Sequence, residues 1–193
     1  MKYPILGLFL FLFSLSDSNA QLEQPLPNKE SFTELQTGLL GLWIGRDFAW
    51  SNAITTNLQV GYNLGFFRSS GLDANGFVLG PVIRFEPRFY NYMNQRVKRG
   101  KPMHSNLGNF VGLRFSYTPS FGSISSNSNL RAASNFQTGL VYVFRRAIHK
   151  SLNYELGLGP SYIRYFDQPV IVGGLSGLNE FGFEIRARIG FRL

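Results

Sequence analysis

Charged residues stand two positions apart in two segments of the chain, residues 84–88 and residues 184–188. Side chains two positions apart point to the same face of a β-strand, so each segment would place positive and negative groups side by side. Such groups can form ion pairs with one another or bind ions from solution. The charged residues expected on strand faces of this kind are Arg84, Glu86, Arg88, Arg114, Glu155, Glu184, Arg186 and Arg188.

These eight side chains would meet if the strands that carry them closed into one barrel. The interior of an eight-stranded barrel is just wide enough to be filled by side chains, and a buried charge without a partner is costly. We therefore expect a packed Arg/Glu network in the lumen. The alternative is a narrow solute channel with anion preference, because arginine outnumbers glutamate in this set.

A dense basic run is formed by Arg96, Lys98, Arg99 and Lys101. A run of like charges is usually a solvated loop, and we interpret it in that way. The alternative is contact with anionic lipid head groups, lipopolysaccharide phosphates or peptidoglycan.

The residues offer little for catalysis. The two histidines, His104 and His149, lie in predicted turns and outside any nucleophile motif. We find no metal-ligand spacing, phosphate loop or nucleic-acid motif. We therefore expect no enzyme, cofactor, bound metal or nucleic-acid partner, and keep a lipid-modifying hydrolase as the less favoured alternative.

The composition favours a sheet of many strands. The chain has 193 residues, with 16% aromatic residues, 21 glycines and only 16% charged residues, against roughly 25% charged in globular proteins. It has no cysteine, which excludes disulfides and thiolate chemistry. The net charge of +8 is spread mostly as single residues within strand-like segments, which favours an anionic membrane surface as partner over DNA.

The N-terminus has the plan of an export signal. Lys2 precedes the apolar run 5–13, and Ser18-Asn19-Ala20 provides small residues before a cleavage site. A spanning helix needs about 20 apolar residues, more than this run contains. We predict a signal peptide over residues 1–20, cleaved after Ala20, followed by a polar leader over residues 21–34.

The mature chain alternates apolar and polar residues over long segments. The clearest is 181–193. Its odd-numbered residues are all apolar, and its even-numbered residues are glycine, glutamate or arginine. This period of two predicts a strand with one apolar and one polar face. Similar patterns occupy residues 54–66, 79–89, 111–117, 136–145 and 152–159, with a less regular one over 35–48.

A soluble β-sandwich also has one apolar and one polar face. The export signal, the strand lengths and the aromatic residues at strand ends favour a membrane barrel instead. We predict an all-β fold: a single antiparallel up-and-down transmembrane β-barrel of about eight strands over residues 35–193. It would lie in the bacterial outer membrane and have a structural or interaction role.

Only seven strands are clear, whereas bacterial single-chain barrels have even numbers. The eighth could include residues 28–35, the leader could thread the lumen, or a break could be hidden within a long segment. With the C-terminus on the periplasmic side, the segments expected outside are 69–76, 119–135 and 167–180, and those expected inside are 49–53, 91–106 and 147–151.

Three parts of the chain resemble small uncharacterised outer-membrane β-barrel proteins of Bacteroidetes-type bacteria. They are the stretch Phe85-Glu86-Pro87-Arg88-Phe89-Tyr90-Asn91 followed by Arg96, Lys98, Gly100 and Lys101, residues 109–119, and Asn153-Tyr154-Glu155 with Gly157 and Gly159. The resemblance implies outer-membrane lipid and lipopolysaccharide as surroundings and the barrel-insertion machinery as an assembly partner. It implies no activity and no other protein partner. One departure is the ending Phe191-Arg192-Leu193, where many such barrels end in an aromatic residue.

Overall fold

The computed structural model describes residues 29–67, 76–91, 99, 106–127, 131–166 and 179–193. The predicted signal peptide 1–20 and the first part of the predicted leader, residues 21–28, lie outside the described residues. No helix in the described ranges is long and apolar enough to cross a membrane.

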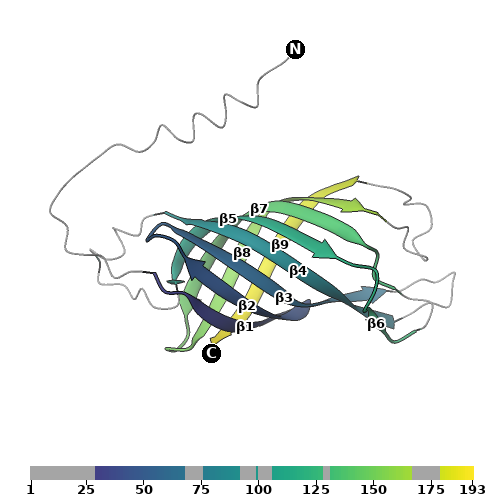
Figure 1. Ribbon diagram of the computed structural model, residues 1–193, viewed down its shortest axis with the longest axis horizontal. Coiled ribbons are helices and arrows are strands. Elements are labelled where there is room, and N and C mark those ends of the chain that lie inside the picture. The colour runs from purple at the N-terminus through teal and green to yellow at the C-terminus, as the bar shows by residue number, and fades with distance from the viewer. Residues whose placement is uncertain (1–28, 68–75, 92–98, 100–105, 128–130, 167–178) are drawn as a thin grey trace, which may run out of the picture.

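The described chain is a closed antiparallel β-barrel (Figure 1). Each long strand pairs with its neighbour along the chain, and the pairing of β1 with β9 closes the ring. Of nine strands, β6 has two residues and pairs only with β4, so eight strands form the wall. The strands are β1 (Phe32–Gly38), β2 (Gly41–Ala49), β3 (Ile54–Phe67), β4 (Gly76–Tyr90), β5 (Gly108–Thr118), β6 (Ile124–Ser125), β7 (Asn135–Ala147), β8 (Leu152–Tyr165) and β9 (Asn179–Arg192).

The first hairpin corrects one expectation. The single strand predicted over residues 35–48 is wrong: the structure has two strands there, β1 and β2, joined by a turn at Leu39 and Leu40. The two central residues of this turn are leucines, which lack the usual turn chemistry of Gly, Asn, Asp or Pro. Gly41, the residue after the turn, has a φ of +152°. The hidden break supplies the eighth strand, and β1 begins at Phe32, within the segment predicted as leader.

Both ends of the wall lie at the same end of the barrel. Glu34 of β1 is paired with Arg192 of β9, and the Leu193 amide donates a hydrogen bond to the Thr33 carbonyl at 3.0 Å. An even number of strands requires this arrangement. The short turns 50–53 and 148–151 lie at this end, and the strand ends that flank 68–75, 119–134 and 166–178 lie at the other.

The two faces of the wall differ as the alternation predicts. Outward-facing side chains are largely apolar and exposed, and inward-facing ones are mostly buried. Large exposed apolar residues occur on all eight wall strands, examples being Leu35, Ile44, Leu58, Phe85, Leu113, Leu140, Leu156 and Ile185. Residues that alternate along each strand therefore lie alternately inside and outside the barrel.

The lumen has an apolar section at the end where β1 begins and β9 ends. Tyr90, Phe110, Val141 and Val143 form a buried cluster, in which the Tyr90 and Phe110 rings lie 5.1 Å apart. The Lys29 ammonium lies 3.0 Å from the centroid of the Tyr90 ring. The lumen therefore holds an apolar cluster in addition to the polar side chains.

Candidate functional site

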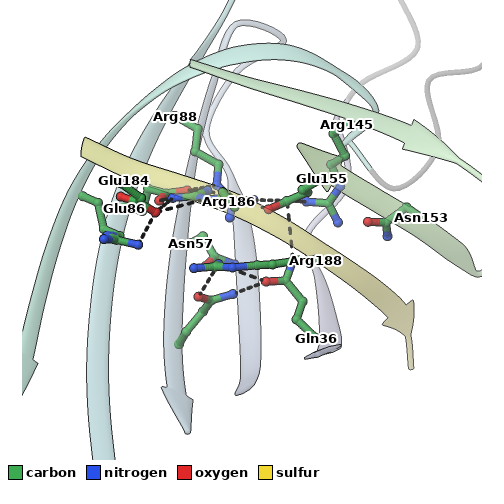
Figure 2. Close-up of polar contacts among 12 residues, drawn as sticks. Gln36, Asn57, Glu86, Arg88, Arg145, Asn153, Glu155, Glu184, Arg186 and Arg188 are labelled. Carbon is green, nitrogen blue, oxygen red and sulfur yellow. Dashed lines mark hydrogen bonds and ion pairs between the residues drawn. The ribbon is translucent and has the colours of Figure 1, made fainter. Parts of the chain in front are cut away.

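The structure gathers the eight predicted lumen residues inside the barrel. Each is buried, with at most 8% of its surface exposed. They come from β4, β5, β8 and β9, and Figure 2 shows the labelled members pointing toward one another across the lumen. Positions that are far apart in the chain meet here because the closed sheet turns their strand faces to a common axis.

Glu86 is the junction of two arginines. The Arg186 guanidinium donates to Glu86 from Nη1 at 3.0 Å and from Nη2 at 2.5 Å, and Arg88 Nε donates to the same carboxylate at 2.8 Å. Arg114 pairs with Glu184, and Arg186 Nη2 lies 3.4 Å from that carboxylate as well. Charge-assisted bonds of this kind are among the stronger hydrogen bonds in proteins.

The network also includes three charged residues that the sequence analysis did not propose: Glu34, Asp47 and Arg145. Arg145 lies 2.6 Å from Glu34 and 3.3 Å from Asp47, and Arg88 lies 3.1 Å from Asp47. The carboxylate oxygens of Glu155 lie 3.2 Å from Arg145, 3.7 Å from Arg186 and 3.9 Å from Arg88. Glu155 therefore lies between Arg145, which pairs with Glu34, and Arg186, which pairs with Glu86.

Arg145 stands on the polar face of the alternating segment 136–145, whereas the sequence signal for Glu34 and Asp47 is weak. Glu34 was assigned to the leader, and Asp47 lay in the irregular segment 35–48. With β1 starting at Phe32, Glu34 alternates with Thr33 and Leu35 as an inward residue should. Finding the turn at Leu39 and Leu40 from the sequence would have recovered this alternation.

Amide side chains extend the network toward β3. Gln59 Nε2 donates to Gln36 Oε1 at 2.7 Å, and Gln36 Nε2 donates to Glu34 at 2.9 Å. Asn57 Nδ2 donates to Asp47 at 2.5 Å. These bonds give the buried carboxylates neutral partners in addition to arginine, as burial of charge requires.

Two arginines of the described lumen, Arg84 and Arg188, form no ion pair within 4.0 Å. In the described lumen, Arg88, Arg114, Arg145 and Arg186 are paired with Glu34, Asp47, Glu86, Glu155 and Glu184. No described carboxylate lies within 4.0 Å of Arg84 or Arg188. The described lumen therefore has a carboxylate-rich paired layer and, apart from it, two buried arginines, Arg84 and Arg188.

Arg84 and Arg188 both lie against Trp43. Each guanidinium carbon is 4.6 Å from the Trp43 ring centroid, within the range of a cation–π interaction. Arg84 Nη2 donates to Asn63 Oδ1 at 2.5 Å, but its Nε and Nη1 have no hydrogen-bond partner. Arg188 Nη1 reaches only the amide oxygens of Gln36 and Gln59, both at 3.4 Å.

The barrel wall has a gap beside these arginines. The β1–β2 hairpin is shorter than its neighbours, so β1 pairing with β9 stops at Gly38 and Arg188. On this side of β9, no described strand pairs with the residues that precede Arg188. Phe181, Phe183 and Ile185, which lie on that free part of β9, are 77–87% exposed.

A cavity of about 490 Å³ occupies the gap. Its lining joins lumen residues, including Trp43, Arg84 and Arg188, to wall residues on the free edge and the hairpin turn, including Leu40 and Ile185. The volume lies within the usual range of small-molecule sites.

The other predicted site residues do not join this arrangement where the structure describes them. Arg99 is exposed in a turn, and Arg96, Lys98 and Lys101 lie outside the described residues. His149 is exposed in the turn between β7 and β8, and His104 lies outside the described residues. No three His, Asp or Glu side chains in the described ranges are grouped to hold a metal ion.

No family model, curated protein or solved structure matches this chain.

Proposed function

We propose that this protein is an outer-membrane β-barrel with a structural or interaction role and a lumen filled by its Arg/Glu network. The observation that carries the proposal is the apolar outer face, which is present on all eight wall strands. Soluble monomers seldom expose a contiguous apolar patch larger than a few hundred Å². Lipid is a medium that can cover such a face all the way around.

Where its strands are paired on both sides, the backbone of the wall suits that medium; the edge of β9 that precedes Arg188 is the exception. In lipid, every backbone polar group in the wall needs an internal partner, and only helices and closed barrels provide this for a spanning structure. Six of the wall strands have 11–15 residues, against the 9–11 residues that cross a bilayer at a tilt. The export signal expected over residues 1–20 supports an outer-membrane location.

The arrangement of the ends supports one orientation. We place the end with both termini and the short turns 50–53 and 148–151 in the periplasm, since outer-membrane barrels have short periplasmic turns and longer outer loops. Outer-membrane lipid and lipopolysaccharide would then surround the wall, and the barrel-insertion machinery would assemble it.

The packed lumen supports a structural role over transport. The charged side chains meet at hydrogen-bond distances in the middle of the barrel, and an apolar cluster follows at the end with the termini. The second candidate is a narrow anion channel, which the two arginines without carboxylate partners favour. Single-channel recording in planar bilayers separates the two: we expect no unitary steps, and anion-selective steps would establish the channel.

The membrane assignment has its own test. A folded barrel resists detergent until it is boiled, so we expect unboiled and boiled samples to migrate differently on a gel, and the refolded protein to float with lipid vesicles. A mature protein that stays monomeric and soluble without detergent would contradict the assignment. We propose no catalytic role.

A further inference from the structure

The cavity in the gap is lined by cationic side chains on its lumen side and by apolar side chains on its wall side. On the lumen side are Arg84 and Arg188, which are 6% and 7% exposed and have no described carboxylate within 4.0 Å. Glu184 also lines the cavity, but its ion pairs are with Arg114 and Arg186. Two guanidinium nitrogens of Arg84 have no hydrogen-bond partner. Unsatisfied buried donors on a cation are costly unless an acceptor reaches them.

The wall side of the same cavity is apolar. Leu39 and Leu40 form the hairpin turn, and Phe183 and Ile185 project from the free edge of β9. These side chains lie on the outer surface, on the face that we assign to lipid. A free inorganic anion would gain nothing from contact with them.

We propose that the gap between β9 and the β1–β2 hairpin binds an anionic amphiphile from the membrane. Its acidic head group would accept hydrogen bonds from Arg84 and Arg188 beside Trp43, and its alkyl chain would lie over Leu40, Phe183 and Ile185. The head group has the chemistry of a phosphate or carboxylate, which guanidinium groups bind well. This inference rests on the proposed membrane location, because the alkyl chain must arrive through the lipid-facing wall.

The charge balance explains why the acid would bind here and not deeper. Arg88, Arg145 and Arg186 already contact two or more carboxylates each. The side-chain hydrogen bonds of Arg84 and Arg188 go to amide oxygens, and both guanidinium groups lie against Trp43. A guest anion at Trp43 would therefore meet two arginines that have no described carboxylate within 4.0 Å.

Trp43 provides a direct reporter for the test. The chain has two tryptophans, and the other, Trp50, is exposed in the turn after β2, so the Trp50→Phe variant leaves Trp43 as the sole emitter. The protein is refolded in dodecyl maltoside, a neutral detergent, and titrated with dodecyl phosphate carrying a brominated chain. Bromine quenches tryptophan only at short range, so we expect saturable quenching of Trp43.

Three comparisons identify what binds. Inorganic phosphate tests a free anion, and a brominated dodecyl maltoside tests the alkyl chain without charge. The Arg84→Gln/Arg188→Gln variant removes the head-group donors, and we expect at least about tenfold weaker binding of dodecyl phosphate. Arg46→Gln is the matched control, because Arg46 is an exposed arginine of β2, and its affinity should equal that of the parent.

The outcomes separate this inference from the proposed function. Equal quenching in the double variant, equal quenching by the neutral amphiphile, or an absence of saturation would each overturn it. Binding of inorganic phosphate as strong as that of dodecyl phosphate would show an anion site that does not use the apolar wall, and would also overturn it. Vesicle flotation and heat-modified migration are measured on the same preparations. A barrel that inserts but does not bind disproves the amphiphile site alone.

Discussion

Arg145 of β7 holds Glu34 of β1 with two hydrogen bonds from its Nη2 atom, at 2.7 and 2.6 Å, although the residues are 111 positions apart in the chain. Both side chains are almost fully buried. The pair joins two strands that do not neighbour one another in the wall. It therefore acts as a brace across the lumen.

Loss of one member of this brace should destabilise the barrel strongly. For Arg145→Met we expect a loss of about 3–5 kcal/mol in the free energy of unfolding, because Glu34 would be left as a buried charge with weaker partners. Urea titration of the refolded protein in lipid vesicles measures it. The double variant Glu34→Gln/Arg145→Met should recover part of the loss.

The pair of Glu30 with Arg192 is the matched control, since those side chains are 50% and 31% exposed. Glu30→Gln should cost about 0–1 kcal/mol, as solvent-exposed pairs do. Equal losses for Arg145→Met and Glu30→Gln would contradict the buried brace.

Gly190 makes room for the Glu34 carboxylate. A Cβ atom at position 190 would collide with the side-chain oxygen of Glu34 and approach Asn153 Oδ1 to 3.0 Å. We expect Gly190→Ala to cost about 1–3 kcal/mol, as overpacking of a filled interior does. Gly182→Ala on the same strand is the control, because the nearest atom to its Cβ would be Ser161 Oγ at 3.9 Å. Urea midpoints that fall equally for both variants would show that Gly190 has no special role.

A charge on the outer face should oppose insertion. Leu140 lies near the centre of β7 and is 51% exposed on the apolar face. Leu140→Arg should cost about 2–4 kcal/mol at the bilayer midplane. Ile148→Arg, in the turn after β7, should cost no more than about 1 kcal/mol near the interface. The folded fraction after mixing with vesicles, read from unboiled gels, measures both, and equal insertion of the two would argue against lipid contact at Leu140.

The two tryptophans should differ sharply in solvent access. Trp43 is 4% exposed inside the lumen, and Trp50 is 72% exposed. Acrylamide should quench a Trp43→Phe variant, which emits from Trp50, far more strongly than a Trp50→Phe variant. The difference should disappear in high urea. Strong quenching of Trp43 in the folded protein would indicate a hydrated lumen and would support the channel over the filled barrel.

The sequence by itself determined the two faces of the wall. A period of two is a local property, so the assignment of Glu184, Arg186 and Arg188 to one face and Phe183 and Ile185 to the other needed no knowledge of the fold. The alternating segments alone also fit a soluble β-sandwich, and the export signal, the strand lengths and the aromatic residues at strand ends favoured a barrel. The eight charged residues predicted to line the lumen are buried because the pairing of β1 with β9 closes the sheet.

Only the tertiary structure decided which charges meet. Arg145 and Glu34 come together because β1 pairs with β9 and closes the ring, a contact that no local pattern records. The gap beside Trp43 likewise depends on where the β1–β2 hairpin stops relative to β9. The strand register and the position of the turn at Leu39 and Leu40 determine the Arg145–Glu34 pair and the gap. Alternation along a strand does not record them, because it is the same whichever strands are paired.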